Sequence, residues 1–139
     1  MAAKKNTEAK ASNYTATITD SSRELSPKEK VMFKDLGNAE SMIDFAKACI
    51  EQGGKATIDV ADYAVISIHN EATDDVDYTN YLLVDKNGNK YYTGSQSFWN
   101  SFINIYNEMK DSDEEWGIEL NLLPSKNYKG KEILTCSLV

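Results

Sequence analysis

Residues 78–109 read YTNYLLVDKNGNKYYTGSQSFWNSFINIYNEM, and they predict a β-hairpin followed by a helix. Asn87-Gly88 stands between two runs of strand-forming residues, which is the strongest short-range signal for a hairpin. We therefore expect strands over residues 78–85 and 90–93, joined by this turn.

The helix is expected over residues 96–109, after the break at Gly94. Ser95 is a suitable N-cap because its hydroxyl can accept a hydrogen bond from the first turn. The apolar residues of the segment recur at helical spacing on one face: Phe98, Phe102, Ile105 and Met109. This pattern is typical of a helix that packs on a core.

Further strands are expected on both sides of this unit, over residues 57–60, 63–69, 116–123 and 132–139. Ala61-Asp62 suits a bulge, so the first two segments are predicted to form one long bent strand. Five strands with a helix between the third and fourth predict a mainly β fold. We expect a small closed barrel, a five-stranded Greek-key barrel of the oligonucleotide-binding (OB) type.

The N-terminal part of the chain is predicted to be added to this barrel. Ser26-Pro27-Lys28-Glu29 is a helix start with a capping box, and a second helix is expected over residues 39–50. Val31, Met32 and Phe33 are predicted to pack inward. The predicted organisation is a single domain with three parts: a flexible tail at 1–13, a helical appendage at 14–54 with a short edge strand at 14–18, and the OB-like barrel at 55–139.

Composition restricts the class of protein. Cys49 and Cys136 are too few for a disulfide framework, and with His69 they form no predicted metal site. No apolar run approaches the length of about 20 residues that spans a membrane. We expect a cytoplasmic protein, in the host bacterial cytoplasm if it is encoded by a phage, that is not an enzyme and has no cofactor.

Charge is segregated along the chain, although its net value is −7. Residues 71–77 contain four acids and no base, and residues 108–115 contain five acids and one base. Residues 125–131, SKNYKGK, contain three lysines and no acid. A basic strip on an acidic body is therefore possible, although an acidic protein is in general repelled by nucleic acid.

The candidate nucleic-acid-binding residues lie in the loop before the last strand and on the second and third strands of the barrel. In an OB fold these strands and this loop contact the ligand. An aromatic residue among cations is what sequence-tolerant single-strand binding needs. The alternative is a solvated loop and tyrosines that fill the core. The candidates are Lys126, Tyr128, Lys129, Lys131, Tyr81, Lys86, Lys90, Tyr91 and Tyr92.

Four segments carry a family resemblance: LGNA (36–39), YAVISIHNE (63–71), YTGSQSFW (92–99) and SKNYKGK (125–131). Through them, residues 25–139 resemble small single-stranded DNA-binding proteins of phages and mobile elements of Gram-positive bacteria. The resemblance implies an OB fold and binding of single-stranded DNA. One departure is the acidic loop at 71–77, which predicts no DNA contact on that side of the groove.

The sequence thus predicts non-catalytic binding of single-stranded DNA in phage or mobile-element replication or recombination. Replication or recombination proteins are further candidate partners, as is a second copy of the chain. The alternative function is a protein-interaction module, such as a phage anti-defence or regulatory protein, that acts through its acidic surface. Oligomeric state, sequence preference and the choice between DNA and RNA stay open.

Overall fold

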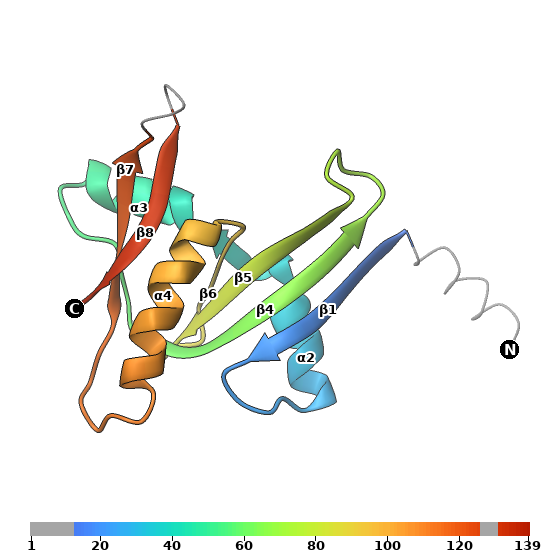
Figure 1. Ribbon diagram of the computed structural model, residues 1–139, viewed down its shortest axis with the longest axis horizontal. Helices are drawn as coiled ribbons and strands as arrows, with labels where there is room; N and C mark the ends of the chain where they lie inside the picture. The colour runs from blue at the N-terminus through green and yellow to red at the C-terminus, as the bar shows by residue number, and fades with distance from the viewer. Residues whose placement is uncertain (1–12, 126–130) are drawn as a thin grey trace, which may run out of the picture.

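A computed structural model describes residues 13–125 and 131–139, and over these residues the fold is mainly β (Figure 1). The strands are β1 (Tyr14–Ser21), β2 (Ala39–Ser41), β3 (Thr57–Ile58), β4 (Val60–Asn70), β5 (Asp77–Asp85), β6 (Lys90–Thr93), β7 (Ile118–Pro124) and β8 (Glu132–Leu138). The helices are α2 (Pro27–Lys34), α3 (Met42–Glu51) and α4 (Gln96–Met109), with a 3-10 turn η1 (Leu36–Asn38). The predicted hairpin and helix at 78–109 are confirmed.

Two sheets are present in the described part of the chain. One has the strand order β1-β4-β5-β6-β2 and the other the order β3-β7-β8. The register between β4 and β5 shifts between Val60 and Asp62, immediately after β3. The predicted bulge at Ala61-Asp62 therefore lies where the chain passes from β3 in the second sheet to β4 in the first, which are two strands and not the predicted single one.

The predicted closed barrel is wrong for the residues that the structure describes. A closed barrel would need β8 to pair with β6, but β6 pairs with β5 and β2, and β8 pairs with β7. Helix α4 packs against the free edge of β8 instead. The Ser101 hydroxyl accepts a hydrogen bond from the Cys136 backbone N–H (3.2 Å), and the Ser95 hydroxyl donates one to the Leu134 carbonyl oxygen (3.4 Å). These side chains satisfy strand-edge groups that a barrel would pair.

The main core lies between α4, the second sheet and one face of the first sheet. Phe98 and Phe102 of α4 are fully buried there, together with Leu83 of β5 and Leu134 of β8. The Ser95 hydroxyl accepts from the Phe98 N–H at 3.1 Å, so the predicted N-cap is confirmed. Burial of the two phenylalanine rings fixes α4 across the opening between the sheets.

A second core lies on the opposite face of the five-stranded sheet, because alternate strand residues point to opposite sides. Ala64, Ile66 and Leu82 pack there against Leu25 and Phe33. Helix α2 thus covers the back of the sheet, behind β1 and β4 in Figure 1. The outer face of β5 is consequently not open along its whole length.

The predicted inward packing of α2 is only partly correct. The capping box between Ser26 and Glu29 is present, and Phe33 is buried. Val31 and Met32, in contrast, are 66% and 59% exposed. A helix of eight residues that lies on a sheet buries a narrow stripe, and three consecutive residues cannot all point to it.

Residues 14–54, predicted as a helical appendage, contribute strands as well as helices. β1 pairs with β4 in antiparallel fashion, so the short edge strand predicted at 14–18 is confirmed and is longer than expected. β2 pairs in parallel with β6. Both outer positions of the five-stranded sheet are therefore filled from this N-terminal segment. The predicted domain boundaries themselves stay predictions.

Candidate functional site

The lysine-rich loop joins β7 to β8. Lys126, Tyr128 and Lys129 lie outside the described residues. The two residues that flank the loop are described: the Ser125 N–H donates to the Lys131 carbonyl oxygen at 3.0 Å. This hydrogen bond closes the base of the β7–β8 hairpin, and the Lys131 side chain is exposed.

The structure does not bring the other two predicted lysines to this hairpin end. Lys86 is exposed in the β5–β6 turn, where its backbone N–H donates to the Asp59 carbonyl oxygen at 3.0 Å. The Lys90 ammonium donates to the carbonyl oxygens of Met32 (2.7 Å) and Asp35 (2.6 Å). Lys90 therefore caps the C-terminal end of α2, where a positive charge is favourable. This role replaces the phosphate contact predicted for it.

Tyr81 serves packing. Its side chain is only 6% exposed, and its ring stacks on Trp99 with centroids 4.8 Å apart and an interplanar angle of 8°. Its hydroxyl donates to the Gln96 side-chain oxygen at 2.8 Å. A ring that is buried in this way has no free face for a base, so Tyr81 leaves the candidate set.

Tyr91 and Tyr92 point to opposite faces of β6, as their alternation predicts. Tyr91 is 8% exposed, its ring lies 4.9 Å from that of Phe45, and its hydroxyl donates to Asp85 at 3.4 Å. Burial, together with the negative charge of Asp85, raises the pKa of Tyr91. Tyr92 is half-buried and packs on the second core. Tyr91 therefore has no open face for a base and also leaves the set, whereas the role predicted for the partly exposed Tyr92 stays a prediction.

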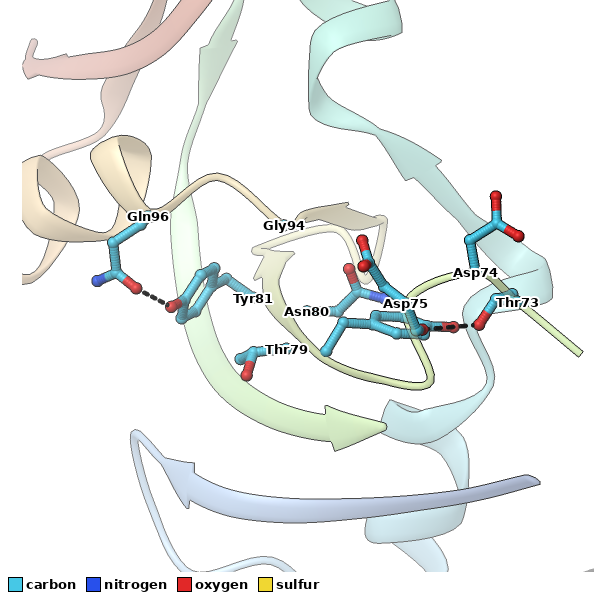
Figure 2. A pocket seen from close by; sticks show the side chains of 9 residues that line it. Thr73, Asp74, Asp75, Thr79, Asn80, Tyr81, Gly94 and Gln96 are labelled. Atoms are coloured by element: carbon cyan, nitrogen blue, oxygen red, sulfur yellow. Dashed lines mark hydrogen bonds between the residues drawn. The ribbon is translucent and has the colours of Figure 1, made fainter. Parts of the chain in front are cut away.

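A hollow of about 530 Å³ lies beside the start of β5, and we call it the β5 hollow. It is lined by Thr73, Asp74 and Asp75 of the β4–β5 loop, by residues 78–81, and by Gly94 and Gln96 (Figure 2). It exists because β6 is shorter than β5. The last β5–β6 pair is Tyr81 with Thr93, so the start of β5 extends beyond its neighbour.

The lining of the β5 hollow determines what it can bind. It has carboxylates at Asp74 and Asp75, an amide at Asn80 and, among the described residues, no lysine or arginine. The Thr73 hydroxyl takes part in a hydrogen bond within the loop, because it donates to the carbonyl oxygen of Asp75 at 2.8 Å. Such a lining favours cations and hydrogen-bond donors and repels phosphate. The predicted absence of DNA contact by the acidic loop agrees with this chemistry, but it stays a prediction.

The sequence did not point to the β5 hollow, although a signal for it existed. The strands predicted at 78–85 and 90–93 differ in length by four residues, and a hairpin of unequal strands leaves the longer one without a partner at its far end. Asn80 and Gln96 were missed for this reason.

His69 links the two ends of the β4–β5 loop. Its Nδ1 lies 2.7 Å from Asp77 Oδ1, and its Nε2 lies 3.2 Å from Glu71 Oε2. Only the protonated ring donates from both nitrogens. The hydrogen bonds with Asp77 and then Glu71 raise the pKa of His69 above its usual 6.5.

This pairing predicts a pH dependence. A raised pKa in the folded state means that the pair stabilises the fold below the unfolded pKa of His69, and that this contribution is lost as pH rises through the folded pKa. We expect an NMR titration to give His69 a pKa above 6.5. We also expect the stability difference between wild type and His69→Gln to shrink as pH rises above the usual pKa of 6.5. A pKa at or below the usual value would show that the two carboxylates do not hold the ring in solution.

Comparison with protein-family models, with curated proteins and with solved structures finds no match to this chain. Among the described helices, none has the length and apolar character needed to cross a membrane. Over residues 13–125 and 131–139, no three His, Cys, Asp or Glu side chains gather in a way that could hold a metal ion.

Proposed function

We propose that this chain binds single-stranded DNA without catalysis, and that it serves the replication or recombination of a phage or mobile element. The observation that carries the proposal is the charge of the β7–β8 loop. Residues 125–131 have three lysines around Tyr128 and no acid, on a chain whose net charge is −7. Cations around an aromatic ring provide phosphate contacts and base stacking together.

The order of elements supports the proposal. From β3 to β8 the chain forms β3 in one sheet and β4 in the other, then β5 and β6, then α4, and then the β7–β8 hairpin. We propose that this unit is an OB-type barrel held open by α4, a fold that is often only partly closed. Because α2 covers part of the outer face of β5 and β6, we place the proposed DNA contact on the β7–β8 loop and not on the strands.

Affinity for single-stranded DNA should fall with salt. Lys90 caps α2 and Lys86 lies in the β5–β6 turn, so we expect about three phosphate contacts, from Lys126, Lys129 and Lys131. At roughly −0.7 per neutralised phosphate, the plot of log K against log salt should have a slope of about −2. Fluorescence anisotropy with a labelled oligonucleotide over a salt series measures it.

A matched pair of variants makes this measurement specific. Lys131→Gln should flatten the slope by about 0.7. Lys28→Gln, at an exposed position of helix α2, should leave the slope unchanged. Binding that does not depend on salt, or equal flattening by both variants, would show that the β7–β8 loop is not the phosphate contact.

The protein-interaction module remains the second candidate, and one observation favours it. The β5 hollow is concave and has two carboxylates, and the residues of its lining that the structure describes include no cation. A basic segment of a protein would be attracted there, whereas a phosphate backbone would be repelled. The two functions use different surfaces, so one chain could have both.

A further inference from the structure

The chain enters the described structure at the base of the β4–β5 loop. The Glu71 N–H donates to the Asn13 carbonyl oxygen at 3.0 Å, which extends the β1–β4 ladder beyond its last pair, Tyr14 with Asn70. Figure 1 shows the start of β1 beside the end of β4. Residues 1–12 therefore join the described structure at Asn13. Its hydrogen-bond partner Glu71 is two positions before Thr73, the first residue that lines the β5 hollow.

These twelve residues have the charge that the hollow lacks. They read MAAKKNTEAKAS, with Lys4, Lys5 and Lys10 against a single acid, Glu8. The hollow presents Asp74 and Asp75, and Glu71 and Asp77 lie at the two ends of the same loop. The two oppositely charged segments thus belong to one chain, so their attraction acts at a high effective concentration.

The hollow also has the shape for an extended segment. The start of β5 has no paired β6 neighbour before Tyr81, although Gly94 approaches it: a Cβ at Gly94 would lie 3.5 Å from the Thr79 carbonyl oxygen. An open strand edge can take up an extended peptide through backbone hydrogen bonds. Ala9 before Lys10, and Ala11 and Ser12 after it, are small enough for close approach. β1 lies two strand spacings from β5, which is about 10 Å, and three extended residues span about the same distance, so Lys10 is within reach of β5 from Asn13.

We propose that residues 1–12 of this same chain dock in the β5 hollow, with their lysines on Asp74 and Asp75. The inference does not depend on DNA binding, because it uses a different surface and the opposite sign of charge. Docking would place the basic N-terminal segment against the acidic β4–β5 loop and withdraw both from other partners.

The test uses the full chain and backbone amide NMR. In a Lys4→Gln, Lys5→Gln, Lys10→Gln variant, the amides of Thr79, Asn80 and Gly94 should shift from their wild-type positions more than amides elsewhere. A peptide of residues 1–12 added to this variant should shift them back in a saturable way. Since a short tether supplies about millimolar effective concentration, a free-peptide Kd on the order of 1 mM is sufficient.

Two further variants decide the site. Asp74→Asn with Asp75→Asn should weaken peptide binding about fivefold or more, whereas Asp111→Asn with Asp113→Asn, in the other exposed acidic loop, should not. Unshifted amides in the triple lysine variant, or equal effects of both pairs, would overturn the proposal. Wild-type shifts that change with protein concentration would assign the segment to a second copy and would overturn docking within one chain.

Discussion

Replacing Phe102 with alanine should destabilise the fold by about 3 to 5 kcal/mol. The ring is fully buried between the two sheets and lies 5.7 Å from Phe98, 5.5 Å from Trp99 and 6.0 Å from Tyr63, centroid to centroid. Its removal leaves a cavity that these neighbours cannot close, because each is held by other contacts. Urea unfolding followed by circular dichroism measures the change in unfolding free energy.

Phe102→Leu is the matched control, because leucine keeps most of the buried volume. It should destabilise by about 1.5 kcal/mol or less, with an unchanged dependence on urea. A loss below about 1 kcal/mol in Phe102→Ala would mean that α4 does not hold the sheets together as described. The leucine variant keeps the comparison possible if the alanine variant does not fold.

Tyr128→Ala should weaken binding of single-stranded DNA by about 1 to 3 kcal/mol, which is the range for loss of one stacked base. Its melting temperature should stay close to that of wild type, because a ring in the loop between β7 and β8 is expected to contribute little to the core. Anisotropy titration and thermal unfolding on the same samples separate the two effects.

Lys129→Ala serves as the comparison within the same loop. It removes a charge and no ring, so it should mainly flatten the salt dependence, by somewhat less than one unit of slope. If Tyr128→Ala lowers stability and affinity together, the ring has a structural role. If neither variant changes binding that is otherwise present, the DNA contact lies on another surface.

Local signals in the sequence were sufficient for most of the elements. Asn87-Gly88 marked the β5–β6 hairpin, Ser95 marked the start of α4, and Ser26 with Glu29 marked the start of α2. Each of these signals acts through backbone hydrogen bonds within a few residues. A single sequence is enough to recognise them.

Contacts between distant segments could not be predicted in the same way. Whether β8 pairs with β6 or packs against α4 depends on Ser95 and Ser101. Their hydroxyls form hydrogen bonds with the β8 backbone, which lies more than thirty positions away in the sequence. Lys90 was predicted as a phosphate contact because its position in the sequence does not show that its ammonium lies at the end of α2. Charge alone does not tell a capping lysine from a binding one.

The candidate site shows the same limit. Alternation along β5 and β6 predicted that one of Tyr91 and Tyr92 points to the core, but not that Tyr81 stacks on Trp99. Burial of Tyr81 and Tyr91 follows from the position of α3 and α4 above them, which is a tertiary fact. The β7–β8 loop keeps its predicted role as a proposal, because it rests on residue types in one short segment.

The proposed function is tested most directly by comparing one labelled oligonucleotide as a single strand and as a duplex at low salt. Stacking needs unpaired bases with open faces, so the chain should bind the single strand at least about tenfold more tightly. Anisotropy titrations of wild type and Tyr128→Ala, on the same two ligands, should show the preference in wild type and its reduction in the variant. Equal binding of both ligands, or binding of neither, would contradict the proposed function and favour the protein-interaction module.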